Sequence, residues 1–305
     1  MAIPPHVYKY RSISKNTGRI IRENELYFSS PLGFNDPFEG RVFPDFNGTE
    51  AQHRKFYEAV LLSAGFSGAQ LQDKIEEYVK KQLLMDAKKA HIFSENTTTR
   101  IMERISTLCF SEKRDDILEW SHYGDEHKGI CLEFSTSDLS SYLSKLRKVV
   151  YSNSYPQLMM FSDPNEEKIK KFILTKSDHW TYESEWRVFE VMGDGFTRRP
   201  GAYEFPPDSL TGIIFGCRIP PSERTKVISW LAGRSSMPKL YQAVVKYRDF
   251  GLDIVPYSPD GNDLHPLISY QAYGIWLERE RDGLDGDALN DWLTAERQVK
   301  AILAT

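Results

Sequence analysis

Hydrophobic and polar residues alternate in several short stretches of the chain, each ending near Gly, Pro, Asn or Ser. Alternation of this kind is typical of strands with one buried face, and short apolar runs between turn residues are typical of fully buried strands. The stretches that fit one of these two patterns are residues 6–11, 25–30, 105–111, 129–134, 148–152, 186–191, 210–216 and 239–247. We therefore predict many short strands, unevenly separated along the chain.

Apolar residues recur instead at helical intervals across residues 50–104, which predicts a helical insert between strands. Shorter helical patterns cover residues 115–124, 136–146, 163–177 and 221–233. No strand is followed by a glycine-rich phosphate loop, so a doubly wound nucleotide-binding fold is not expected. The pattern predicts an α+β fold, with a small mixed or split β-sheet, the helical insert and flanking helices.

Residues 257–266 are rich in turn residues and predict a linker. Two amphipathic helices follow it, separated by the sequence DGLDGD, and form a predicted C-terminal helical hairpin. Tyr270, Tyr273, Trp276 and Trp292 are expected to pack these helices together or against the main body. We therefore expect an α+β domain over residues 1–256 and a helical module over residues 264–305.

The chain has 305 residues and a formal net charge of −4, so no overall basic field argues for nucleic-acid binding. The three cysteines are widely spaced within apolar strands, which is typical of reduced, buried thiols in the cytoplasm. They form no recognised ligand set with histidine, so no metal site is expected. We also expect no signal peptide and no membrane-spanning segment.

The sequence TYESEWRVFEV, residues 181–191, contains two carboxylates two residues apart. If the strand extends over both, Glu183 and Glu185 lie on the same face. They could form a solvated acidic edge, but Trp180, Tyr182 and Trp186 flank them, as expected in a cleft with shifted pKa values. Arg187 could pair with either glutamate, which would be a structural use of the pair.

Other polar residues lie in or beside predicted strands, and each also has a structural interpretation. Lys9 and Arg11 share one face of the first strand, and Tyr8 and Tyr10 share the other, where both tyrosines could belong to the core. The second strand ends in Ser29 and Ser30 before a proline, a common strand ending.

Asn35 and Asp36 stand in the loop sequence GFNDPFEG, where they could form an Asx turn. Trp120 and Tyr123 are three residues apart on a predicted helix and could pack in the core or provide a platform for a ligand. These loop and helix residues complete the set of candidate binding residues.

Together these segments resemble a bacterial family defined only as a conserved domain of unknown function. The resemblance rests on YKYRS, LYFSSPLGFNDPFEG, CFSEKRDDILEWSHYG, KGICLEF and YESEWR, and spans roughly residues 6 to 216. The C-terminal AYGIWLERE and DWLTAERQV resemble a second, short helical family of unknown function. Neither resemblance implies an activity.

A more distant resemblance does imply one. The order of a basic residue on the first strand, a second strand that ends in Ser and a late Glu-x-Glu is similar to ADP-ribosyltransferases of the Arg–Ser–Glu type. The resemblance implies a split sheet that binds NAD as a substrate. It also implies a protein or nucleic-acid acceptor, as in a toxin or phage-defence effector.

The same resemblance implies roles for the candidate residues. Glu185 would stabilise the oxocarbenium-like transition state, and Glu183 would accept the proton of the attacking nucleophile. The cations would bind the diphosphate, the serines would support the ribose or Glu185, and an aromatic residue would stack on nicotinamide. The residues expected to bind NAD are Lys9, Tyr10, Arg11, Tyr27, Ser29, Ser30, Asn35, Asp36, Trp120 and Tyr123.

Two other classes of function remain open. The first is a non-enzymatic module that binds a ligand or protein and docks a partner through residues 264–305. The second is a metal-dependent nuclease with Glu183, Glu185 and Asp36 as ligands, which is disfavoured because no lysine closely follows the acidic pair.

Overall fold

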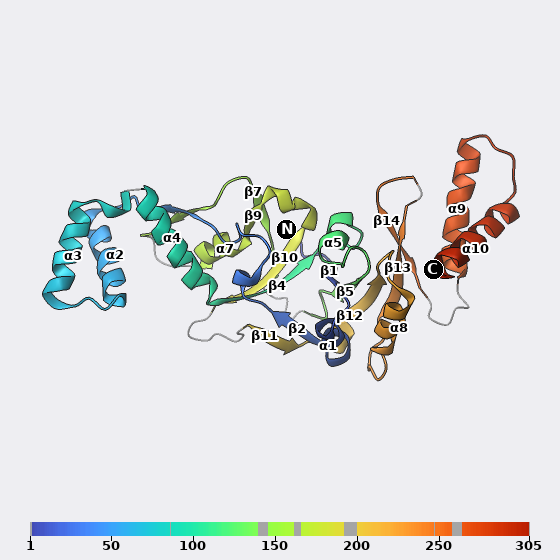
Figure 1. The fold of residues 1–305 in the computed structure, drawn as a ribbon, viewed down its shortest axis with the longest axis horizontal. Coiled ribbons are helices and arrows are strands. Elements are labelled where there is room, and N and C mark those ends of the chain that lie inside the picture. Colours follow the sequence, from blue (N-terminus) through green and yellow to red (C-terminus); the bar gives the residue numbers. More distant parts are fainter. Residues whose placement is uncertain are drawn as a thin grey trace.

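The fold is described from a computed structural model that covers residues 2–85, 87–139, 146–161, 166–191, 200–246, 248–257 and 264–304. The molecule is elongated, with a helical region at one end, a β-sheet in the middle and a pair of helices at the other end (Figure 1). The α+β class and the C-terminal helical hairpin predicted from the sequence are both confirmed.

The central sheet is mixed and has the strand order β14-β13-β12-β5-β1-β4-β10-β6. Its strands are β1 (His6–Arg11), β4 (Ile105–Ser111), β5 (Ile130–Ser135), β6 (Arg147–Lys148), β10 (Glu185–Val191), β12 (Leu210–Phe215), β13 (Lys239–Val245) and β14 (Leu252–Pro256). Strands β12 and β13 run parallel, and the other neighbours are antiparallel.

The sheet opens between β1 and β4. These two strands pair at Tyr8 and Ser111, whereas β1 pairs with β5 from His6 to Arg11. Farther along β4, the backbone of Thr107 exchanges hydrogen bonds with Ser29, which follows β2 (Glu25–Phe28). The expected split in the sheet therefore lies beside the first strand, and Ser29 lies at its far side.

Three pairs of short strands lie outside the central sheet. They are β2 with β11 (Gly201–Glu204), β3 (Phe43–Asp45) with β8 (Gln157–Met159), and β7 (Val150–Ser152) with β9 (Thr175–Ser177). The short 3-10 helices are η1 (Pro31–Gly33), η2 (Leu83–Met85), η3 (Asp178–Glu183) and η4 (Pro207–Ser209).

Helices cover both faces of the sheet. Helices α1 (Lys15–Glu23) and α8 (Pro221–Ser229) cover the face with the largest apolar cluster, which includes Val7, Phe110 and Val188. Helix α5 (Ile117–His122) lies over the opposite face, where Trp120 packs with Tyr10, Cys131 and Ile214. The polar cavity described below lies at the gap between β1 and β4, where both faces contribute to its lining, Tyr8 and Tyr10 on this face and Lys9 and Arg11 on the other.

The predicted helical insert consists of α2 (Glu50–Ser63), α3 (Gly68–Lys80) and α4 (Ala87–Met102). Thr49 begins α2 with a capping box, in which its hydroxyl accepts from Gln52 and the Gln52 side chain accepts from the Thr49 backbone. Tyr57, Leu61, Leu71 and other residues give the insert an apolar cluster of its own.

Helices α9 (His265–Arg281) and α10 (Ala288–Ala304) pack together through Ile268, Ala295 and Val299. The predicted packing role of the aromatic residues is confirmed for Trp292, which packs in this cluster, and Tyr270 contacts Asp253 of β14 in the main body. Tyr270, Tyr273 and Trp276 are 41%, 58% and 38% exposed, and the last two stack on each other instead. The predicted linker falls largely on residues 258–263, outside the described residues.

The predicted helix over 163–177 is too long. Helix α7 (Glu166–Leu174) ends earlier, and Thr175–Ser177 form β9, which pairs with β7. The helix predicted over 136–146 falls mostly on residues 140–145, which lie outside the described residues. Within the described part of the chain, no helix is both long and apolar enough to cross a membrane.

Candidate functional site

A polar cavity of about 450 Å³ lies where β1 and β4 diverge. Its volume falls within the range of small-molecule sites, which is roughly 300–1,000 Å³. The residues that line it are Tyr8, Lys9, Tyr10, Arg11, Tyr27, Ser29, Gly33, Phe34, Asn35, Glu39, Thr107, Cys109, Phe110, Ser111, Glu119, His122, Tyr123, Lys176, Glu183, Glu185 and Arg187. The cavity thus brings together residues from the first strand to β10.

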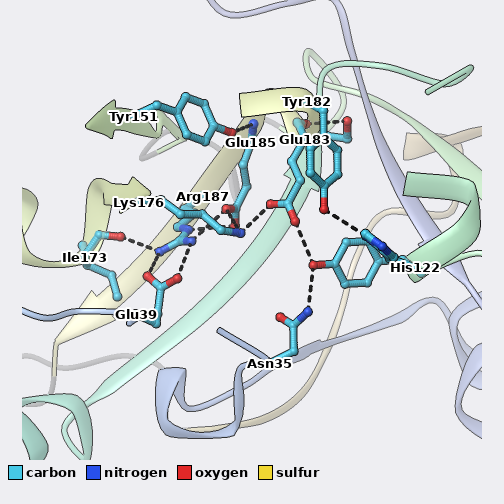
Figure 2. Close-up of polar contacts among 12 residues, drawn as sticks. Asn35, Glu39, His122, Tyr151, Ile173, Lys176, Tyr182, Glu183, Glu185 and Arg187 are labelled. Atoms are coloured by element: carbon cyan, nitrogen blue, oxygen red, sulfur yellow. Dashed lines mark hydrogen bonds and ion pairs between the residues drawn. The ribbon is translucent and has the colours of Figure 1, made fainter. Parts of the chain in front are cut away.

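Glu185, the first residue of β10, is held by Arg187 two residues later. Arg187 donates from Nε to Oε1 and from Nη2 to Oε2, each at 2.7 Å. Arg187 is fully buried, and it also binds the Glu39 carboxylate and the carbonyl oxygen of Ile173 (Figure 2). Burial alone would raise the pKa of Glu185, but the Arg187 guanidinium and the Lys176 ammonium together outweigh burial and lower this pKa to about 2. Glu185 is therefore an ionised carboxylate in the cavity wall.

Glu183 and Glu185 meet at one lysine, but they do not share a strand face. Glu183 ends the 3-10 helix η3, and Ser184 then adopts a left-handed backbone conformation with φ of 45° before β10 begins. The Lys176 ammonium donates to both carboxylates, at 3.2 Å to Glu185 (Figure 2). The turn at Ser184 brings the two side chains together. The sequence alone had predicted that both would lie on one face of a strand, which is not the case.

Tyr123 completes the surroundings of Glu183. Its hydroxyl donates to Oε1 of Glu183 at 2.8 Å and accepts from Nδ2 of Asn35 at 3.2 Å. Burial raises the pKa of Glu183 above its usual range, although Lys176 opposes this shift. Glu183 is therefore better suited than Glu185 to accept a proton near neutral pH.

Lys9 and Arg11 form the cationic part of the cavity. Lys9 donates to the carbonyl oxygen of Cys109 at 2.8 Å, across the gap between β1 and β4. Burial and the nearby Arg11 charge lower the pKa of Lys9 to about 8. Among the described residues, no carboxylate forms an ion pair with either cation. Two neighbouring cations without carboxylate partners are suited to an anionic ligand group.

The backbone of Arg11 is in close contact with the loop after α5. A Cβ on Gly129 would lie 2.3 Å from the carbonyl oxygen of Arg11, so only glycine fits at this position. Earlier in the loop, Asp125, Glu126 and His127 all have positive φ, a costly conformation for residues with side chains. The end of β1 that carries Arg11 is thus fixed by backbone packing.

Three of the predicted binding residues lie outside the cavity lining. Trp120 is fully buried, donates from Nε1 to the carbonyl oxygen of Arg114, and packs edge-on against Tyr10, so it has no free face on which nicotinamide could stack. The Ser30 hydroxyl caps η1, and the Asp36 carboxylate accepts from the backbone of Phe38, as in an Asx turn. The other predicted residues all line the cavity: Lys9, Tyr10, Arg11, Tyr27, Ser29, Asn35, Tyr123, Glu183 and Glu185.

Sequence reasoning missed three ionisable residues of the site, whereas it named Arg187 as a possible partner of either glutamate, and the pairing with Glu185 is confirmed. Glu39 lies far from its partner Arg187 in the chain, so no spacing pattern links them. Lys176 lies in a segment predicted to be helical, and Glu119 precedes Trp120 in the predicted helix 115–124 without any sign of which side chain faces the cavity. The surplus of polar residues around Trp120 was the one available signal.

A larger cavity of about 570 Å³ lies against the helical insert, and Glu39 lines both cavities. Its walls include many apolar residues, among them Phe46, Leu84 and Met102. Three of the charges on its wall are ion-paired, since Arg41 binds Glu95 and Glu39 binds Arg187, and Asp45 accepts from Asn47 and Gln157. The smaller cavity, with its cations and three buried glutamates, is therefore the candidate active site.

Residues 119–188 match the model of a family described as Protein of unknown function (DUF2971). This match confirms, for that segment, the resemblance to a family of unknown function. The segment contains Glu119, Tyr123, Lys176, Glu183, Glu185 and Arg187, which all line the cavity. Comparison with curated proteins and with solved structures gave no match.

Proposed function

We propose that the protein is an NAD-dependent ADP-ribosyltransferase that acts on a protein or nucleic acid, as a toxin or phage-defence effector does. The observation that carries the proposal is the ionised Glu185 carboxylate, buried in the wall of a cavity that also contains Lys9 and Arg11. An ADP-ribosyl transfer needs a negative charge near the ribose and positive charge near the diphosphate. Both lie in one cavity of suitable volume.

Each residue then has a defined part in the reaction. The bond between the ribose and nicotinamide breaks, its electron pair leaves with nicotinamide, and an acceptor atom bonds to the anomeric carbon. Glu185 stabilises the positive charge that develops on the ribose, since Arg187 and Lys176 keep this carboxylate ionised and fixed. Glu183 accepts the acceptor's proton, and Lys9 and Arg11 bind the diphosphate.

The test is release of nicotinamide from NAD by the purified protein, with mass spectrometry of co-purified protein and nucleic acid for added ADP-ribose. Glu185→Gln keeps the shape of the side chain and removes its charge, so we expect turnover to fall about 100-fold or more. Wild-type turnover in Glu185→Gln would contradict the mechanism, and absence of turnover in the wild type would contradict the proposed function.

Glu112→Gln is the matched control. The Glu112 carboxylate accepts from Trp186 of β10 at 3.0 Å and pairs with Lys148, but it does not line the cavity. It therefore tests whether disturbing β10 from outside the cavity is enough to lower turnover. We expect nicotinamide release by this variant to stay within about twofold of the wild type.

The exposed aromatic residues of α9 favour a second proposal, a non-enzymatic binding module that docks a partner through residues 264–305. Tyr273 and Trp276 stack on each other with large exposed fractions, and such exposed apolar surface often marks an interaction site. This proposal predicts no NAD turnover, and partner binding that is lost when residues 264–305 are removed. Partner binding that survives the truncation would contradict the docking role.

A further inference from the structure

Glu119 is the third buried carboxyl of the cavity, and its surroundings differ from those of the other two. It lies in the first turn of α5, lines the cavity and is 5% exposed. Lys176 donates to both Glu183 and Glu185. Among the described residues, no lysine or arginine forms an ion pair with Glu119. A buried carboxyl without a cation is costly to ionise.

The hydrogen bonds of Ser111 leave it without a hydrogen for Glu119. The Ser111 hydroxyl donates its one hydrogen to the carbonyl oxygen of Glu183 at 2.8 Å, and its oxygen accepts from the backbone of Lys113 at 3.1 Å. Ser111 lies close to the Glu119 carboxyl, but its single hydroxyl hydrogen is already used, so it cannot fully compensate an ionised Glu119.

The electrostatic surroundings of Glu119 also favour its neutral form. The pKa of Glu119 is raised to about 8, chiefly by burial and also by the nearby carboxylates of Glu183 and Glu185, against the opposing contact with Ser111. The titratable groups that face it are Lys9 and Tyr10 of β1, Cys131 of β5, Glu185 of β10, Tyr182 and Glu183 of η3, and Asp116 at the start of its own helix.

We propose that Glu119 binds the ligand as a neutral carboxylic acid, which donates a hydrogen bond to an uncharged acceptor oxygen of that ligand. No proton is transferred in this contact. The inference rests on the proposed function for the identity of that oxygen, the carboxamide oxygen of nicotinamide. A neutral acid in this position binds the amide end of NAD, and the ionised carboxylate acts on the ribose.

The protonation state can be tested without NAD. Infrared spectra of the wild type minus Glu119→Gln at about pH 7 should show the carbonyl stretch of a protonated carboxylic acid, which disappears at about pH 9.5. Glu112→Gln, which replaces an ionised carboxylate, should leave this band in place. If Glu119→Gln does not fold, Glu119→Met provides the same subtraction. Absence of the band at about pH 7 would overturn the proposal.

The binding role is tested by calorimetry with NAD in a Lys9→Arg background. Arginine stays charged across the range, so the titration of Lys9 near the same pH no longer contributes. With Glu119 present, affinity should fall roughly tenfold or more between about pH 7 and about pH 9.5, because the donor form is depleted. With Glu119→Gln, whose amide still donates, affinity should stay constant, and with Glu119→Ala it should be weak at every pH.

The outcomes separate this inference from the proposed function. If the wild type shows the infrared band but does not bind NAD, Glu119 is a neutral acid as inferred, and NAD is not its ligand. A pH dependence of NAD binding that persists in Glu119→Gln contradicts the role of Glu119 and leaves the transferase proposal standing.

Discussion

Two glutamates of the cavity show how different one residue type becomes in two buried places. Glu119 of α5 and Glu185 of β10 are each 5% exposed. Yet the pKa of Glu119 is raised to about 8, and that of Glu185 is lowered to about 2. Burial pushes both values upward, so burial does not explain the contrast.

The difference lies in the neighbouring cations. Glu185 receives two hydrogen bonds from the Arg187 guanidinium and one from Lys176, whereas Glu119 has a serine as its neighbour. A bidentate guanidinium supplies both charge and hydrogen bonds to a carboxylate. One cavity can therefore contain an ionised carboxylate and a neutral carboxylic acid at the same pH, each suited to a different part of one ligand.

Removing the guanidinium is expected to have the largest effect on this contrast. Arg187→Met would leave the carboxylates of Glu185 and Glu39 buried without their main cation, and we expect a loss of about 3–5 kcal/mol in the free energy of unfolding. Urea denaturation measures it. In the control Arg114→Met, a half-exposed arginine 3.7 Å from Glu133 is removed, and we expect a loss of about 1 kcal/mol or less. Equal losses in the two variants would show that the ion pairs of Arg187 with Glu185 and Glu39 do not stabilise the fold more than a surface ion pair does.

The stability contribution of Glu119, the neutral carboxyl, should be sensitive to alkali. The pKa of Glu119 is raised in the folded state, so its contribution to stability is full at low pH and is lost as the pH rises from about 4.5 to about 8. The free energy of unfolding of the wild type should therefore fall relative to Glu119→Gln by about 2–4 kcal/mol across this window. Urea denaturation at a series of pH values measures it, and a constant difference between the two proteins would contradict the raised pKa.

The stability contribution of Glu185, the ionised carboxylate, should be sensitive to acid. The pKa of Glu185 is lowered in the folded state, so its contribution is full above about pH 4.5 and is lost as the pH falls towards about 2. We expect the stability advantage of the wild type over Glu185→Gln to shrink by about 2–3 kcal/mol in this window. Acid titration of the folded fraction by circular dichroism checks this, and an advantage that grows in acid would contradict the ion pair.

The strands that carry the cavity were predictable from local patterns. Residues 6–11 and 105–111 form strands with the predicted bounds, because alternation and apolar runs are local signals. For the acidic pair the sequence left a solvated edge and a cleft open, and burial of both glutamates agrees with the cleft that their aromatic neighbours favoured. Local sequence was therefore sufficient to predict those parts of the site that depend on residues adjacent in the chain.

Not every partner of these residues was predictable. The pairing of Arg187 with Glu185 follows from their closeness in the chain and is confirmed. Glu39 and Arg187, however, meet only after the chain has folded, and the left-handed turn at Ser184 is not evident from residue type. Lys176 was assigned to a helix because the apolar pattern of α7 runs up to it, whereas pairing of β9 with β7 ends that helix early.

The smallest expected effect concerns Tyr123, which follows α5 and binds Glu183. Its hydroxyl donates to Glu183 at 2.8 Å, and Tyr123→Phe removes this bond while keeping the ring. We expect a loss of about 1 kcal/mol in the free energy of unfolding, since Glu183 keeps Lys176 as a partner. Tyr182→Phe is the control, because its hydroxyl contacts the exposed His122 at 2.9 Å and its removal should cost about 0.5 kcal/mol or less. If the control variant loses as much free energy of unfolding as Tyr123→Phe, the Tyr123 hydroxyl has no special part in holding Glu183. The contrast between Glu119 and Glu185 then depends on the cations alone.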